Sequence, residues 1–242
     1  MKIFFLVLVF SISQASFCQN IDGSWELIQK NNKPLSGSSC IRIYEDGYFM
    51  ESSKEGDYKF SDAKGGRYTV DASTYSEEYD FNTSEENLIH TSKKFKISTT
   101  NDTLQLKAGN QSSTWLRISS AKNKLSGLWV LKGNKENGKV TFDLPKNQTC
   151  LKIISGEKFQ WVTFNPENGK FIACGAGSSY AQYDVYLENI EVFSRDEIMV
   201  GASLSFEYEL DNGQWYHRGT SSEGKPLYEI WEPYRFKKSL RE

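Results

Sequence analysis

The sequence predicts an all-β protein built from two tandem antiparallel domains, and three observations lead to this fold class. Apolar and polar residues alternate with period two in many short segments, and no window sustains a helical stripe beyond two turns. Turn-forming residues recur between these segments, as expected for a sandwich or a barrel. The second half of the chain also repeats a series of short motifs from the first half in the same order.

Composition narrows the class of protein further. The 242-residue chain has 31 acidic and 29 basic residues and a formal charge of −2. A nucleic-acid-binding protein would carry a clustered positive excess to meet phosphates, so no nucleic acid is expected as a partner. An aromatic share of 14% with only 5 prolines argues against a disordered chain.

Residues 1–19 have the pattern of a secretory signal peptide. Lys2 precedes the apolar stretch from Ile3 to Ile12, and a region of small residues follows it. A bilayer-spanning helix needs roughly 20 apolar residues, about twice this stretch. We therefore expect export to the periplasm, the outer-membrane surface or the medium, after cleavage behind Ser16, Cys18 or Gln19. Lipidation of Cys18 is the alternative, although Phe17 precedes it where lipoprotein signals have Gly, Ala or Ser.

The internal repeat divides the rest of the chain. The matches are Gly23-x-Trp25 with Gly127-x-Trp129, Cys40-Ile-Arg-Ile43 with Cys150-Leu-Lys-Ile153, Gly65-Gly66-Arg67-Tyr68 with Gly177-Ser178-Ser179-Tyr180, Tyr75–Tyr79 with Tyr186–Ile190, and Trp115 with Trp231. This order predicts a first domain over residues 20–120 and a second over 121–236. A short polar linker, Ser119–Lys124, joins them.

Several strands and turns can be placed within each copy. Phe206–Leu210 alternates apolar and charged residues, as a strand with one buried face does. Residues 165–169 (NPENG) separate two apolar runs, which predicts a hairpin with positive φ at Gly169. Asp46-Gly47, Ser155-Gly156 and Asp211-Asn212-Gly213 are further turn signals. The glycines at 65–66 and 175–177 indicate bulges or tight turns.

Cysteine and histidine are too few for a metal or disulfide scaffold. Cys40, Cys150 and Cys174 remain after signal cleavage, so at most one disulfide can form. They fit best as small buried residues within strands. The chain has two histidines, His90 and His217, and no closely spaced cysteine pair, which argues against zinc. We predict neither a metal nor a cofactor.

Gly-x-Trp at the start of an all-β domain resembles the first strand of the lipocalin and calycin barrels. The resemblance implies that the tryptophan plugs the closed end and that a basic residue from the last strand packs over it. Arg117, two residues after Trp115, matches that residue in the first copy. In the second copy the nearest candidate is Arg235. The Thr-Asp-Tyr motif of the classical lipocalins is missing from both copies.

The chain also resembles a family of uncharacterised lipocalin-like domains from exported proteins of Bacteroidetes. The second copy carries the pattern more fully, with Gly127-x-Trp129, Cys150-Leu-Lys-Ile, Phe159-Gln-Trp161, Tyr186-x-Glu188 and Glu229-Ile-Trp231. The resemblance covers nearly all of residues 21–234. It implies two tandem antiparallel lipocalin-like β-barrels and no known activity.

Aromatic residues are the candidates for both closure and binding. The tryptophans that recur in both copies are predicted to close the barrels together with Arg117; they are Trp25, Trp115, Trp129 and Trp231. Trp161 and Trp215 have no duplicate and are the best binding candidates, because aromatic side chains suit partly apolar pockets. The full set of ligand-binding candidates is Trp161, Tyr180, Tyr186, Tyr208, Trp215 and His217. The alternative is that they fill the core or lie on the surface.

The sequence therefore predicts a non-catalytic protein that binds a small, partly apolar or amphipathic ligand in the second barrel. The alternative is a structural or protein-interaction module of the cell envelope, in which aromatic faces dock the two barrels or a partner protein. The direction of the Trp161 and Trp215 side chains distinguishes the two functions. Side chains that point into a cavity support ligand binding, and side chains that point outward into a patch support docking. No enzyme is predicted, because the pairs Glu77 with Glu78 and Glu188 with Glu191 fit the outer faces of strands. An enzyme would require Glu188, His217 and Tyr180 to converge in one cleft.

Overall fold

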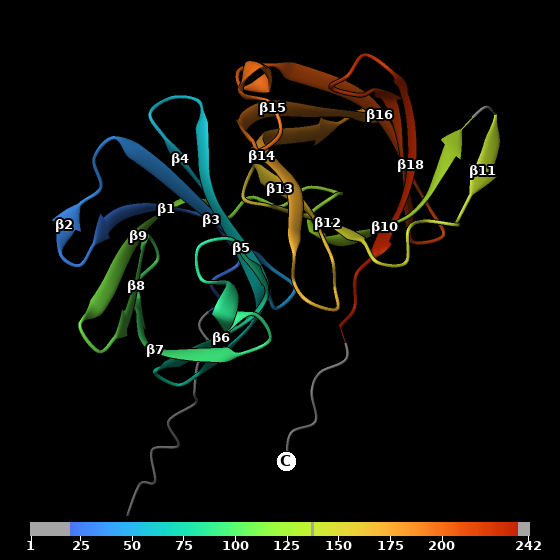
Figure 1. Ribbon diagram of the computed structural model, residues 1–242. Coiled ribbons are helices and arrows are strands. Elements are labelled where there is room, and N and C mark those ends of the chain that lie inside the picture. Colours follow the sequence, from blue (N-terminus) through green and yellow to red (C-terminus); the bar gives the residue numbers. More distant parts are fainter. Residues whose placement is uncertain (1–19, 137, 237–242) are drawn as a thin grey trace, which may run out of the picture.

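The computed structural model describes residues 20–136 and 138–236. They form two closed antiparallel barrels of eight strands each, lying side by side (Figure 1). The predicted fold class is therefore confirmed. The predicted signal peptide and Cys18 lie outside the described residues. Within the described part of the chain, no helix is long and apolar enough to cross a membrane.

Barrel 1 runs from β1 to β9. Its elements are β1 (Gly23–Lys30), β2 (Lys33–Pro34), β3 (Ser38–Glu45), β4 (Tyr48–Glu55), β5 (Lys59–Asp71), β6 (Thr74–Asn82), the 3-10 helix η1 (Glu86–Leu88), β7 (Ser92–Thr99), β8 (Thr103–Ala108) and β9 (Gln111–Ser119). Each strand pairs with its neighbour in the sequence, except that β3 pairs with β1 and not with β2, and β9 returns to β1 to close the sheet. Closure leaves no unpaired sheet edge around the barrel.

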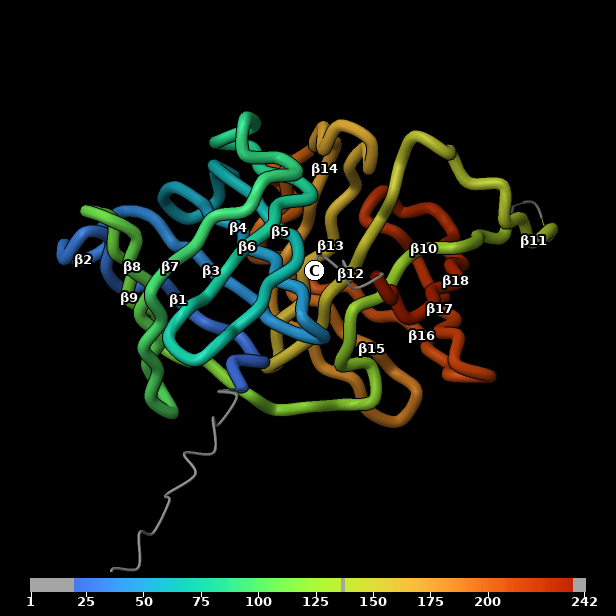
Figure 2. Tube along the Cα trace, turned by 90° about the horizontal axis from the view of Figure 1, so that it is seen from below, coloured from blue at the N-terminus to red at the C-terminus, as the bar shows by residue number. Residues whose placement is uncertain are grey.

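Barrel 2 repeats this topology. Its elements are β10 (Gly127–Glu136), β11 (Lys139–Thr141), β12 (Thr149–Ser155), β13 (Lys158–Phe164), β14 (Phe171–Gln182), β15 (Val185–Phe193), the 3-10 helix η2 (Glu197–Met199), β16 (Ser203–Asp211), β17 (Gln214–Thr220) and β18 (Pro226–Pro233). β18 closes it on β10. In both barrels a short strand, β2 or β11, folds back on the end of the first strand, and β11 projects from the body (Figures 1 and 2).

The hairpins follow the predicted turn residues. Asp46 and Gly47 have φ values of 53° and 75°, and Asn212 and Gly213 have 50° and 80°. Positive φ at both central residues is what the tight turns that match the twist of paired strands require. Gly169, at φ 69°, ends the predicted turn between β13 and β14. These three turn predictions are confirmed.

A β-bulge opposite a glycine interrupts the strand pairing in each barrel. The register shifts between Gly65 and Gly66 on β5, and between Ala176 and Gly177 on β14. A Cβ added at Gly66 or at Gly177 would lie 1.9 Å from a carbonyl oxygen of the neighbouring strand, so only glycine fits. The bulges confirm one predicted role for these glycines. They also correct the repeat by one residue, because Gly66, not Gly65, is the structural match of Gly177.

The closed end of barrel 1 has the predicted arrangement of tryptophan and arginine. Trp25 is fully buried, and its Nε1 donates to the carbonyl of Ile21 at 2.9 Å. The guanidinium carbon of Arg117 lies 4.0 Å from the centre of the Trp25 ring. Arg117 also donates to the carbonyls of Asn101 and Asp22 at 2.7 Å each. The cation therefore covers the plug and satisfies carbonyls of the surrounding loops.

The closed end of barrel 2 keeps the tryptophan and lacks the cation. Trp129 Nε1 donates to the carbonyl of Leu125 at 2.8 Å, as Trp25 does in barrel 1. The residue in register with Trp129 on the last strand is Pro233, where barrel 1 has Arg117 opposite Trp25. The candidate Arg235 is exposed and lies beyond the end of β18. Barrel 2 is thus closed by the tryptophan alone.

The two barrels pack together through an apolar interface. Outward-facing side chains of β3 to β6 meet those of β10 and β12 to β14 in one buried cluster. The rings of Phe81 and Phe164 lie 5.3 Å apart, and those of Phe60 and Phe171 stack at 5.7 Å. Gln160 Nε2 donates to the carbonyl of Glu51 at 3.2 Å across the same interface. β9 ends at Ser119, and the chain then runs along one side of the pair to β10 (Figure 2).

Candidate functional site

Each barrel encloses a cavity that opens to solvent away from its Gly-x-Trp plug. The cavity of barrel 2 has a volume of about 330 Å³ and that of barrel 1 about 550 Å³. Leu131 and Leu27, each two residues beyond the plug tryptophan, line the two cavities. A cavity of a few hundred Å³ is in the range of small-molecule sites.

Apolar and aromatic side chains form the walls of the barrel 2 cavity. They come from strands on all sides of the barrel and include Trp161 of β13, Phe193 of β15, Leu204 and Phe206 of β16, and Leu227 of β18. The rings of Trp161 and Phe193 meet edge to face at 5.8 Å. Such walls favour a ligand with an apolar body over a fully hydrated ligand.

A buried ion pair lies at the floor of this cavity. Lys152 of β12 and Glu188 of β15 are each 3% exposed, and Lys152 Nζ lies 2.8 Å from Glu188 Oε1. Lys152 Nζ also lies 5.3 Å and 5.2 Å from the ring centres of Trp215 and Trp231. A buried ammonium is stable here because the carboxylate neutralises it and the ring faces attract it.

His217 and Glu229 form the second polar pair of the floor. His217 Nδ1 lies 3.1 Å from Glu229 Oε2, and Trp231 Nε1 donates to the same oxygen at 3.0 Å. Burial, together with the charge of Lys152, lowers the pKa of His217. Burial raises the pKa of Glu229, but the hydrogen bond from His217, the charge that His217 carries when protonated and the charge of Lys152 outweigh this and lower it. Glu229 is therefore ionised and accepts the Nδ1 hydrogen of a neutral His217.

Two acceptor atoms of this pair are left without a protein partner. No described residue hydrogen-bonds Glu229 Oε1, and the Glu229 side chain is 22% exposed while lining the cavity. His217 Nε2 is buried and has no partner among the described residues. With Nδ1 protonated, Nε2 carries a lone pair. His217 and Glu229 thus offer hydrogen-bond acceptors to the cavity and no spare donor.

Trp161 of barrel 2 occupies the position that a charged residue, Glu51, occupies in barrel 1. In barrel 2 Trp161 pairs with Lys152 on one side and Gly175 on the other, and a Cβ at Gly175 would lie 2.6 Å from Trp161 Nε1. In barrel 1 the corresponding residues are Glu51 opposite Arg42 and Lys64. An indole over a glycine has therefore replaced an ion pair.

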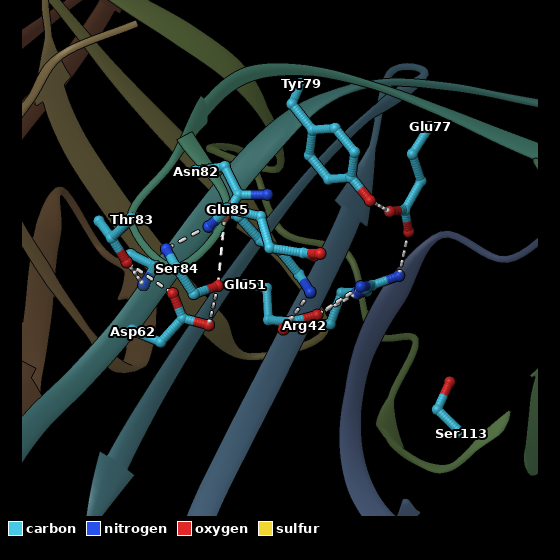
Figure 3. Close-up of polar contacts among 12 residues, drawn as sticks. Arg42, Glu51, Asp62, Glu77, Tyr79, Asn82, Thr83, Ser84, Glu85 and Ser113 are labelled. Carbon is cyan, nitrogen blue, oxygen red and sulfur yellow. Dashed lines mark hydrogen bonds and ion pairs between the residues drawn. The ribbon is translucent and has the colours of Figure 1, made fainter. Parts of the chain in front are cut away.

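The interior of barrel 1 is held by a network of four charged side chains (Figure 3). Arg42 donates through Nε to Glu51 Oε2 at 2.7 Å and through Nη1 to Glu77 Oε1 at 2.6 Å. Lys64 Nζ lies 3.1 Å from Glu51 Oε1, and the Tyr79 hydroxyl donates to Glu77 Oε2 at 2.5 Å. Burial raises the pKa of Glu51, but Arg42 and Lys64 outweigh it and bring the value to about 2. All four carboxylate oxygens of this network have a partner.

A second polar group lies toward the mouth of barrel 1 (Figure 3). Thr83 Oγ1 donates to Asp62 Oδ1 at 2.5 Å, and the backbone of Ser84 and Glu85 donates to Asn82 Oδ1 at 3.2 and 3.0 Å. These contacts fix the segment after β6. Barrel 1 therefore has the larger cavity, with a polar lining whose charged floor is internally neutralised.

The predicted binding residues divide between cavity, core and surface. Trp161 and His217 line the barrel 2 cavity. Tyr186, Tyr208 and Trp215 are buried in the core cluster of barrel 2 and do not line its cavity. Tyr180 is 53% exposed on the outer face, because it lies an odd number of residues from the inward-facing Gly175. The structure thus brings two of the six residues to the cavity.

The predicted closure residues divide as well. Trp25, Trp129 and Arg117 are at the closed ends, as described above. Trp115 and Trp231 instead line the two cavities, with the cations of Arg42 and Lys152 at 4.7 and 5.2 Å from their ring centres. Each lies two residues before the residue that pairs with the plug tryptophan, Arg117 or Pro233. Its side chain therefore also points inward, one layer above the plug. Their prediction as closures is corrected to cavity floor.

The glutamates need a correction too. Glu77 is 1% exposed and Glu188 3% exposed, so both point into the barrels and not to solvent. Each is two residues after a buried tyrosine, Tyr75 or Tyr186, and inward side chains follow period two. Their cationic partners on β3 and β12, Arg42 and Lys152, also recur at the same place in the repeat. A cation and a carboxylate recur at equivalent inward-facing positions of the two copies. This repetition is the sequence signal that could have identified the buried glutamates.

The cysteines are the other reactive side chains of the described residues. Cys40, Cys150 and Cys174 form no disulfide. Cys150 lines the barrel 2 cavity, but burial raises the pKa of its thiol to about 11. Within the described ranges no group of three His, Cys, Asp or Glu side chains is placed to hold a metal. Tyr180 lies outside the cavity that Glu188 and His217 share.

An antiparallel barrel of eight strands, each joined to the next along the chain and closed on the first strand, has the up-and-down topology of lipocalin-like barrels. Among solved structures, two from Bacteroides are similar to part of the chain. An uncharacterised protein of Bacteroides eggerthii DSM 20697 is 11% identical and a lipocalin-like protein of Bacteroides uniformis ATCC 8492 is 15% identical. Both have a TM-score of 0.33, and each match covers 40% of this chain and 99% or 96% of the other. No family model and no curated protein matches the chain.

Proposed function

We propose that the protein is an exported, non-catalytic carrier or sensor that binds a small, partly apolar molecule in the cavity of barrel 2. One observation carries the proposal: this cavity combines apolar walls with a carboxylate oxygen, Glu229 Oε1, that has no hydrogen-bond partner among the described residues. Small-molecule sites have this composition, with few polar groups placed among many apolar ones. Trp161 points into the cavity, and this favours ligand binding over docking of a protein on that side chain.

The volume limits the ligand. About 330 Å³ lies near the lower end of the range for ligand pockets, so the ligand is a small molecule and not a long lipid chain. The surrounding side chains are buried in a closed barrel, which keeps the site preformed and lowers the ordering cost of binding.

The test is an NMR screen of the full chain with fragments of roughly 10–15 non-hydrogen atoms, a size chosen for such a pocket. Bound fragments are expected to perturb Trp161 and Phe193 signals. Leu204→Trp, which fills the cavity from β16, is expected to remove this binding. Leu187→Trp is the matched control, because Leu187 lies on the outer face of β15 with 36% exposure.

Equal binding by the two variants would place the site elsewhere and overturn the proposal. Native mass spectrometry of protein purified from its own host then identifies the natural occupant. Mass spectrometry of the mature N-terminus tests the export proposal, which predicts loss of residues 1–19 or of a shorter leader.

A further inference from the structure

We propose that the ligand of barrel 2 carries a protonated amine, which sits against Glu229 at the cavity floor. This inference rests on the proposed function and names the chemical class of the ligand. The ligand has a cationic polar end and an aromatic or apolar body.

The first argument is the geometry of Glu229. Oε2 is fixed by two donors, His217 Nδ1 at 3.1 Å and Trp231 Nε1 at 3.0 Å, which orient the carboxylate. Oε1 has no hydrogen bond from any described residue, and the side chain is reached from the cavity. An oriented carboxylate with one open oxygen needs a donor, and a charged donor binds it about twice as strongly as a neutral one.

The second argument is the balance of charge at the floor. Lys152 contributes one positive charge, Glu188 and Glu229 one negative charge each, and the neutral His217 none. The sum is one negative charge. In barrel 1 the same count, Arg42 and Lys64 against Glu51 and Glu77, is zero. The barrel 2 floor is therefore incomplete by one cation, and a cationic ligand would complete it.

The mouth of the cavity does not supply this cation. Arg195 is the other basic residue among the described lining side chains, and it is exposed to solvent after the end of β15. Solvent and salt screen the charge of the exposed Arg195 more than they would screen a buried charge. Lys152 is already committed to Glu188 at 2.8 Å.

The third argument is the set of neighbouring acceptors and rings. His217 Nε2 presents a lone pair and has no partner among the described residues. Trp161 and Trp231 line the cavity with Glu229. Ring faces attract cations, and a carboxylate ligand would instead meet Glu229 as a like charge in a poorly solvated site.

The experiment compares three probes with the same ring system, each titrated calorimetrically into the full chain at pH 7.5. They are 2-naphthylmethylamine, 2-naphthylmethanol and 2-naphthoate. The amine is expected to bind roughly 10- to 100-fold more tightly than the naphthoate, with the alcohol between them.

Glu229→Gln is the decisive variant, because it keeps the shape of the side chain and removes its charge. It is expected to weaken amine binding about tenfold and to leave alcohol binding within about threefold. Glu207→Gln is the matched control: the same change on the outer face of β16 should alter none of the three affinities. Circular dichroism and urea unfolding establish that each variant is folded.

The outcomes separate this inference from the proposed function. If the naphthoate binds as tightly as the amine, or if Glu229→Gln leaves the amine affinity unchanged while folded, the amine inference is overturned and the binding site stands. If none of the three probes binds and the fragment screen is also empty, the proposed function itself fails. Should Glu229→Gln not fold, Trp161→Leu with the three probes replaces it. That variant is expected to weaken the amine more than the alcohol.

Discussion

Arg42 and Lys152 occupy the same place in the two barrels, yet they serve two different interiors. Arg42 joins two buried carboxylates, Glu51 and Glu77, and a second cation balances them. Lys152 has one carboxylate partner, and the indole of Trp161 stands where Glu51 would be. The first interior is electrically complete, whereas the second has an apolar wall and an unpaired carboxylate oxygen.

The comparison indicates that one scaffold can carry a charge network that stabilises the interior in one copy and a binding cavity in the other. Both barrels keep the plug tryptophan, the glycine bulge and the closing strand pair, which are demands of barrel geometry. The charged side chains that project into the two cavities have diverged. The duplication therefore provides an internal control, because a change in one barrel can be compared with the equivalent change in the other.

The largest expected effect comes from removing the buried cations. Arg42→Met leaves Glu77 with no cationic partner and is expected to destabilise barrel 1 by about 3–5 kcal/mol. Lys152→Met should cost barrel 2 less, because Lys152 forms one ion pair, with Glu188, whereas Arg42 forms two. Hydrogen exchange of peptides from each barrel measures the two losses separately. A larger loss in barrel 2 would contradict the comparison.

A smaller effect is expected at the glycine beneath Trp161. Gly175→Ala places a methyl group where Trp161 Nε1 is 2.6 Å away, and overpacking of this kind costs about 1–3 kcal/mol. The indole should be pushed into the cavity, so fragment binding weakens with it. Ala176→Gly on the same strand is a control that removes a methyl group and leaves Trp161 in place. Unchanged fragment affinity in Gly175→Ala would show that Trp161 does not shape the site.

Acid should weaken barrel 2 before barrel 1. The native pKa of His217 is below its ordinary value of about 6.5, so the unfolded chain binds the proton first and stability falls as the pH drops through 6.5. Lys152, Glu188, Glu229 and Tyr186 surround this ring.

In barrel 1 the pKa of Glu51 falls from 4.5 to about 2, so its contribution is kept at neutral pH and lost only between those values. The measurement is the pH dependence of hydrogen exchange for each barrel in the wild type and in His217→Gln. The variant is expected to lose the slope near pH 6, whereas an identical slope in both proteins would exclude His217 as its source.

The smallest effect concerns the closed ends. Arg117→Leu should cost barrel 1 about 1 kcal/mol, because the cation over Trp25 and its bonds to two carbonyls are partly exposed. Pro233→Arg should add up to about 0.5–1 kcal/mol to barrel 2 if the new side chain reaches Trp129. Thermal unfolding of both variants tests whether the plug needs its cation. No change in either protein would mean that the tryptophan closes each barrel alone.

The sequence by itself determined the scaffold. Period-two alternation, the turn residues and the ordered repeat predicted two all-β domains, because strand geometry and hairpin turns impose local rules that are visible along the chain. Asp46-Gly47 and Gly169 were predicted from such rules, and the pair of Trp25 with Arg117 was predicted from the resemblance to lipocalin barrels; all of them occur in the structure. The repeat was aligned one residue out of register at Gly65 because Gly65 and Gly66 are consecutive glycines, and only the pairing with β6 shows which of them matches Gly177.

Only the tertiary structure decided what each interior contains. Trp115 and Trp231 recur as closure residues would, yet they lie on the cavity floors, and Tyr180 is an aromatic residue on the outer face. Glu188 and Glu229 join Lys152 and His217 from four different strands, and their separation in the chain hides the site. Strand phase tells which residues point inward, but closure of the barrel decides which of them meet, and so which charges are paired and which oxygen is left open.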